Sequence, residues 1–307
     1  MGRTPSLWLF AAALAAFPAA AQNQGLVVRD GTLGEGPLEV GPDPLDPTTS
    51  YLITPQMGER SGDNLFHSFA RFGIGVDETA TFTGPDGIDN VISRVTGGVE
   101  SRIDGTLRST IEGADVWLLN PSGVVFGAGA ELDVPGSFHA STANYVAFEG
   151  GLERFYTDGR PSSVLSTARP EAFGLLGSEA GPISVTGARL EVRAGESIEL
   201  AGGDVTLTAA TLDAPRGAVS IRGGKIVVEE GSKVLAETAD ENPAGTITVE
   251  ASDVCSSTTA CSRSTPRRRV MPASSTSRVP RSSSATARDS STLTTSRPMS
   301  PTRPRSA

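Results

Sequence analysis

Short groups of alternating apolar residues, separated by turn-forming residues, recur from Val185 to Val249. Six apolar residues of this stretch follow one another at steps of 7, 7, 7, 7 and 8: Ile198, Val205, Leu212, Val219, Ile226 and Val234. A step of about seven residues fits one short strand and one corner, and three such faces make a turn of about 21 residues. The pattern predicts an all-β fold, a right-handed parallel β-helix (a solenoid) in which each coil stacks on the previous one.

A sevenfold apolar spacing also occurs in coiled coils, so that alternative has to be weighed. Gly202-Gly203, Pro215, Gly217 and Gly223-Gly224 lie inside the stretch. In a helix each Gly costs about 1 kcal/mol and each Pro about 3 kcal/mol. The other alternative is a β-sandwich, but dipeptides typical of hairpins are scarce here. The solenoid is therefore the preferred interpretation.

Residues 25–180 show less regular strand signals, and these predict strands that cap and begin the solenoid at its N-terminal end. Asn120-Pro121-Ser122-Gly123 fits a type I turn position by position. Helix signals are weak throughout, and the best candidate is a short segment from Asn64 to Phe69.

The first 21 residues have the features of an export signal. Arg3 supplies a positive charge, and an apolar run from Leu7 to Phe17 follows it. Small residues at Ala19 and Ala21 predict cleavage before Gln22. The alternative is an uncleaved membrane anchor, for which the apolar run is short.

Composition changes abruptly near residue 253. Residues 253–307 hold ten Arg, no Lys, no Gly and two acidic residues, so this segment carries +8 of a net charge of −9 and residues 1–252 carry −17. Both cysteines, Cys255 and Cys261, lie in it, so disulfides do not hold the body together. Three interpretations stay open: a disordered tail, a Ser/Thr/Pro-rich stalk, or an out-of-frame translation, which the abruptness favours.

Four segments carry a resemblance to a known family. They are Asn64-Leu65-Phe66-His67-Ser68-Phe69, then Asn90 to Gly98, then Leu119 to Gly127, and finally Gly136 to Ala143. In this order they resemble elements of the filamentous haemagglutinin N-terminal domain, which directs two-partner secretion in Gram-negative bacteria. One departure is Ser122, where the family most often has Asn; Ser keeps a small hydrogen-bonding side chain, so we expect the turn to survive.

The resemblance implies the domain organisation and the function. We expect a signal peptide at 1–21, a secretion domain at 22–180, the first passenger coils at 181–252 and the low-complexity tail at 253–307. The expected partner is an outer-membrane transporter barrel with periplasmic recognition domains, which exports the chain through the periplasm to the cell surface or beyond it. Adhesion or surface display, through a ligand on a host or neighbouring cell, is the expected role. The residues expected to serve transporter recognition or structure are Asn64, Leu65, Phe66, His67, Ser68 and Phe69, with Asn120, Pro121, Ser122 and Gly123.

The sequence contains few residue patterns that are typical of an enzyme. The two histidines, His67 and His139, lack partners at metal-ligand spacings, so no metal, cofactor or catalytic residue is predicted and each His is expected to pack locally. The alternative function is a secreted β-helix enzyme of the polysaccharide-lyase type, for which Asp204, Asp213 and Arg222 would have to share one face. The acidic body argues against nucleic acid as a partner.

Overall fold

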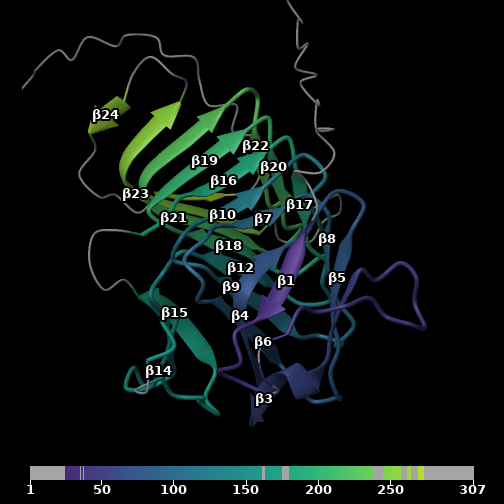
Figure 1. The fold of residues 1–307 in the computed structure, drawn as a ribbon. Coiled ribbons are helices and arrows are strands. Elements are labelled where there is room, and N and C mark those ends of the chain that lie inside the picture. The colour runs from purple at the N-terminus through teal and green to yellow at the C-terminus, as the bar shows by residue number, and fades with distance from the viewer. Residues whose placement is uncertain are drawn as a thin grey trace, which may run out of the picture.

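The protein is an all-β solenoid of about seven turns (Figure 1). The computed structural model describes residues 25–256 except 35, 37, 161–162, 175–179 and 238–244, together with the backbone of 261–263 and 269–272; side chains are described up to residue 252. The predicted cleavage site, Ala19, Ala21 and Gln22, lies outside the described residues, as does most of the predicted tail. In the described part of the chain no helix is both long enough and apolar enough to span a membrane.

Three faces of parallel strands form the coils. The first face contains β4 (Asn64–Gly73), β6 (Asn90–Val95), β9 (Asp115–Leu119), β12 (Phe138–Ser141), β18 (Ile198–Ala201) and the first halves of β21 (Ala218–Glu229) and β23 (Thr246–Ser256). The second face contains β7 (Ser101–Ile103), β10 (Val124–Phe126), β16 (Ile183–Thr186), β19 (Asp204–Thr208) and the second halves of β21 and β23. The third face contains β2 (Tyr51–Ile53), β5 (Thr79–Phe82), β8 (Thr106–Ser109) and β11 (Glu131–Asp133), followed by β17 (Arg189–Glu191), β20 (Thr211–Asp213) and β22 (Lys233–Leu235).

The strand register confirms the turn length expected from the sevenfold spacing. Ile198 pairs with Val219 on the first face, and Val205 pairs with Ile226 on the second, so each pair lies 21 residues apart. All four side chains are buried inside the coils. Each step of seven therefore moves the chain from one face of the solenoid to the next, and three steps bring it back above its starting point.

The N-terminal end of the solenoid is capped by antiparallel strands, as predicted. β1 (Leu26–Arg29) pairs antiparallel with the second half of β4, and β3 (Gly58–Ser61) pairs antiparallel with its first half. A single 3-10 turn, Pro55–Met57, leads into β3. These strands lie beside the first coil in Figure 1.

The prediction of a short helix at Asn64 to Phe69 is wrong, because these residues begin the long strand β4. Leu65 and Phe69 belong to the core inside the coils, whereas Phe66 belongs to a second apolar cluster on the outer side. Both sides of β4 are therefore covered. A strand covered on both sides loses the alternation of apolar and polar residues that normally identifies it.

An antiparallel sheet is inserted between β12 and β16. It contains β13 (Tyr145–Phe148), β14 (Arg154–Tyr156) and β15 (Pro170–Gly174), and Figure 1 shows β14 and β15 beside the coils. Its inner face buries Val146, Phe148 and Phe155 against Phe66 and Ile92 on the outer side of the first face. We call this sheet the extension. It interrupts the solenoid sequence without interrupting the stack, since β12 still pairs with β18.

The last coil described contains β23 and the strands that pair with it. β23 continues through residue 252 to Ser256 and pairs in parallel with β21. Two short strands, β24 (Cys261–Arg263) and β25 (Arg269–Pro272), pair antiparallel with β23.

Candidate recognition site

The first predicted recognition segment, Asn64 to Phe69, is interior to the folded protein. Each of its six side chains is at most 1% exposed. Leu65 and Phe69 point into the coils, and Phe66 packs against Phe148 and Phe155 of the extension, with ring centroids 6.0 and 4.9 Å away. A partner that binds the folded surface therefore has no access to these side chains.

Asn64 links the coils to the extension through a ladder of buried polar groups. Its Nδ2 donates to the backbone oxygens of Ser166 (2.9 Å) and Ala168 (2.7 Å), and its Oδ1 accepts from Asn90 Nδ2 (2.9 Å). Asn90 Oδ1 in turn accepts from Trp117 Nε1 (3.2 Å). The three ladder side chains come from three successive coils, one from each of β4, β6 and β9. Sequence reasoning missed the partnership of Asn90 and Trp117, which exists only once the coils are stacked.

Ser68 belongs to a second polar network on the same side of β4. Its Oγ donates to Asp30 Oδ2 (2.6 Å) and accepts from Arg94 Nε (2.7 Å), and Arg94 also donates to Thr32 Oγ1 (2.9 Å). Burial alone would raise the pKa of Asp30, but the hydrogen bonds from Ser68, Thr32 and Thr96 outweigh it and lower that pKa. Asp30 is therefore a carboxylate that joins the N-terminal chain to the first two coils.

His67 lies inside the first coil between aromatic rings. Its ring centroid is 6.0 Å from that of Phe69 and 5.5 Å from that of Phe82. Burial lowers the pKa of His67 to about 4, against a weaker opposing contact with the Met57 backbone. The imidazole is thus neutral near pH 7 and serves as a core side chain.

The second predicted segment, Asn120 to Gly123, forms the corner between β9 and β10. The Gly123 amide donates to the Asn120 carbonyl (3.1 Å), which confirms the predicted β-turn. Asn120 is fully buried; its Nδ2 donates to Val99 O (2.9 Å) and Ser101 Oγ (3.0 Å), and its Oδ1 accepts from the Ser122 amide (3.0 Å). Pro121 and Ser122 are half-buried. Asn120 therefore fixes the turn and ties it to the preceding coil.

The two predicted segments do not form one continuous surface. β4 lies in the first coil, whereas the turn follows β9, which is separated from β4 by β6. Their shared property is that their polar side chains hold neighbouring coils together. In the folded domain both segments act as structure.

The other histidine, His139, packs on the outer side of the first face. Its ring stacks on Trp117 with centroids 3.7 Å apart and planes at 6°. His139 Nδ1 lies 3.0 Å from Glu199 Oε2, and Nε2 lies 4.0 Å from Asp115 Oδ2. Burial raises the pKa of Asp115. His139 thus joins the coil before the extension to the coil after it.

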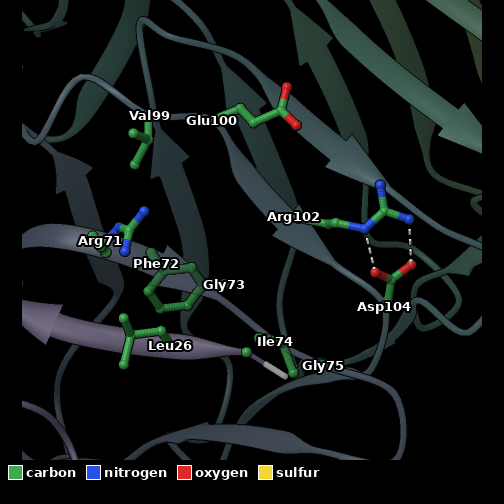
Figure 2. Close-up of a pocket in the computed structure, with 11 residues that line it drawn as sticks. Leu26, Arg71, Phe72, Gly73, Ile74, Gly75, Val99, Glu100, Arg102 and Asp104 are labelled. Atoms are coloured by element: carbon green, nitrogen blue, oxygen red, sulfur yellow. Dashed lines mark hydrogen bonds and ion pairs between the residues drawn. The ribbon is translucent and has the colours of Figure 1, made fainter. Parts of the chain in front are cut away.

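A cavity of about 360 Å³ opens where β1, the end of β4 and β7 meet. Figure 2 shows Arg71, Glu100 and Arg102 around it, with the Arg102 guanidinium paired to Asp104 (Nε to Oδ2, 2.5 Å). The cavity is lined by none of the residues predicted for recognition.

The three residues that a lyase would need do not converge. Asp204 lies on the second face, Asp213 on the third, and Arg222 on the first. Asp213 pairs with Arg189 (2.7 Å), while Arg222 pairs with Glu199 (3.2 Å) in the preceding coil. Among the described residues no group of three or more His, Cys, Asp and Glu side chains is arranged to hold a metal ion.

In a comparison with protein-family models, residues 47–255 match the TPS secretion domain. This range covers more than half of the 307 residues and includes both segments that were predicted to serve recognition or structure. The chain belongs to the TPS secretion domain family. Members of this family are generally non-catalytic exoproteins, exported by two-partner transporters. A search of curated proteins found no match.

Membership in this family confirms the resemblance seen in the four sequence segments. The TPS domain is recognised by a two-partner transporter, and the chain is a secreted exoprotein. The matched range extends past residue 180 into the coils that were predicted to begin the passenger.

Proposed function

We propose that the transporter's periplasmic domains bind two segments of this TPS domain, Asn64–Phe69 and Asn120–Gly123, before the domain folds. After export the first segment becomes interior to the first coil, and the second becomes the corner between β9 and β10, with Asn120 buried and Pro121 and Ser122 half-buried. In this role each segment serves recognition in the extended chain and structure in the folded one. The exported protein then serves adhesion or surface display.

The burial of the first segment supports this order of events. Its six side chains are at most 1% exposed, so a transporter domain that contacts Leu65, Phe66 or Phe69 has to meet them while β4 is unpaired. The extended state also presents the free backbone edge of β4, which in the folded domain is paired with β6 on one side and with β1 and β3 on the other.

The solenoid architecture supports export in an unfolded state. Each coil pairs with the next one along the chain, apart from the inserted extension, so coils can stack in the order in which they leave the transporter. Folding outside the cell then opposes backward movement. Because contacts between adjacent coils span about one turn of chain, no distant segment has to arrive first.

The test compares binding of the purified periplasmic domains of the cognate transporter to three ligands. These are a peptide of residues 60–73, a peptide of residues 116–127, and the folded chain. We expect the peptides to bind and their scrambled versions not to bind, while the folded chain binds at least ten-fold more weakly. Equal affinity of the folded chain would contradict recognition before folding.

Two variants separate recognition from folding. Asn120→Ala in the second peptide should weaken binding, since the peptide has no fold to lose. Leu200→Ala, in a fully buried position outside both segments, should destabilise the chain and thereby increase its binding. If Leu200→Ala left binding unchanged despite a lower unfolding midpoint, the transporter would bind the folded surface, which would contradict the proposal.

The role in adhesion or surface display needs its own assay. Cells that carry the chain and its transporter should be labelled by antibody without permeabilisation and should retain more host or neighbouring cells after washing than cells with the transporter alone. Surface labelling without increased retention would limit the role to display.

A further inference from the structure

The last coil of the solenoid has an edge that the fold closes with antiparallel strands. β23 pairs with β21 in parallel along one side, from Thr246 to Ser256. On its other side β25 pairs with Thr246–Val249, and β24 pairs with Asp253–Cys255. An unpaired strand edge is a template for pairing with another chain, and solenoids need such capping at their ends. β24 and β25 thus form a cap, and Figure 1 shows β24 beside the end of β23.

The register of this cap places the two cysteines of the chain opposite one another. Cys255 of β23 is the cross-strand partner of Cys261 of β24. Directly opposite residues of an antiparallel pair have Cα atoms about 4.5–5.5 Å apart. A disulfide accommodates Cα separations of about 4.4–6.8 Å. The backbone therefore meets the distance requirement without rearrangement.

We propose that Cys255 and Cys261 form a disulfide that fastens the cap to the last coil. The two thiols lose two electrons and two protons as one S–S bond forms. The oxidant is a small-molecule disulfide such as oxidised glutathione, which is reduced to two thiols through a mixed disulfide. Because the chain folds after export, the bond forms outside the cell, which is an oxidising compartment; this location rests on the proposed export by the two-partner route.

The chemical test does not depend on export. The purified chain is diluted into a buffer of reduced and oxidised glutathione and alkylated with iodoacetamide without prior reduction. The mass of the intact chain is then measured by mass spectrometry. The chain should stay monomeric, take up no alkyl group and be lighter by two hydrogen atoms; after reduction it should take up two alkyl groups. Two free thiols in the oxidising buffer, or disulfides only between chains, would overturn the proposal.

A matched variant tests whether the register is responsible. The double substitution Cys261→Ser with Ser262→Cys keeps two cysteines but moves one to the position opposite Val254. Neighbouring positions of a strand lie on opposite faces, so residue 262 lies on the other face from Cys255. This variant should keep its thiols free in the buffer that oxidises the native chain. Equal oxidation of both chains would show that the strand pairing plays no part, and would overturn the proposal.

The consequence for the solenoid is tested by Cys255→Ser with Cys261→Ser. Without the bond the cap opens more readily, so this variant should show a larger dimer fraction in size-exclusion chromatography than the oxidised native chain. Reducing the native chain should raise its dimer fraction in the same way, whereas the reductant should leave the variant unchanged. An unchanged dimer fraction in both experiments would show that the bond does not fasten the cap.

Discussion

The ladder that begins at Asn64 should contribute strongly to the stability of the first coils. Asn64→Ala removes the two hydrogen bonds donated to Ser166 and Ala168 and the one accepted from Asn90. At a net value of about 1 kcal/mol per bond, the free energy of unfolding should fall by about 3 kcal/mol. The loss should be large because Asn64, Asn90 and Ser166 are at most 5% exposed, so their lost partners are not replaced by water.

Asn64→Asp gives a sharper version of the same test. The carboxylate keeps the acceptor for Asn90 but loses both donated bonds, and it places a negative charge against two carbonyl oxygens. Its cost should therefore exceed that of Asn64→Ala, although Asp is closer to Asn in shape. Thr186→Ala, at an exposed position of β16, is the control and should stay within about 0.5 kcal/mol of the native chain.

Urea unfolding followed by Trp117 fluorescence measures these effects. In a chain that lacks residues 1–21, Trp117 is the only tryptophan, and it is the last member of the ladder. The reasoning predicts a lower urea midpoint at an unchanged slope for both Asn64 variants. It would be refuted if Asn64→Ala matched Thr186→Ala, or if Asn64→Asp were the more stable of the two Asn64 variants.

Three further predictions concern His67, the turn and the outer ion pairs. The pKa of His67 falls from 6.5 to about 4 on folding, so the unfolded chain takes up a proton at a higher pH than the folded chain does. The free energy of unfolding should therefore fall by up to about 3 kcal/mol as the pH is lowered from 6.5 to 4. The urea midpoint of His67→Phe should fall less than that of the native chain on the same acidification. Gly123 has φ +129° and a Cβ there would lie 3.2 Å from the Pro182 oxygen, so Gly123→Ala should cost about 1–3 kcal/mol, whereas Gly41→Ala, with no atom within 4 Å, should leave the melting temperature unchanged. Arg222→Ala breaks half-exposed ion pairs and should cost less than about 1 kcal/mol in urea unfolding; a loss above about 2 kcal/mol would contradict this.

The sequence predicted the later coils better than the first ones, for a physical reason. Between Ile198 and Ile226 a turn takes 21 residues and the corners are short, so inward-facing residues recur at a nearly constant step. In the first coils the pairs Leu65–Val91 and Val91–Val116 lie 26 and 25 residues apart, because longer corners are inserted between the strands. The period is then lost although the same three faces persist.

One part of the candidate site could be predicted from the sequence, and another part could not. The turn at Asn120 could be predicted because its hydrogen bonds connect residues close in sequence, such as Asn120 and Ser122. The ladder from Asn64 to Trp117 could not, since its partners are brought together only by stacking coils about one turn apart. The extension was also missed, because its apolar residues cover the outside of the first face and follow no solenoid period.

The most direct test of the central account is export of the full chain with and without its cognate two-partner transporter in a Gram-negative host. We predict that the chain accumulates outside the cell or on its surface when the transporter is present, and stays in the periplasm when it is absent. Retention in the periplasm despite a functional transporter, or equal release without one, would contradict the assignment of this solenoid as a working secretion domain.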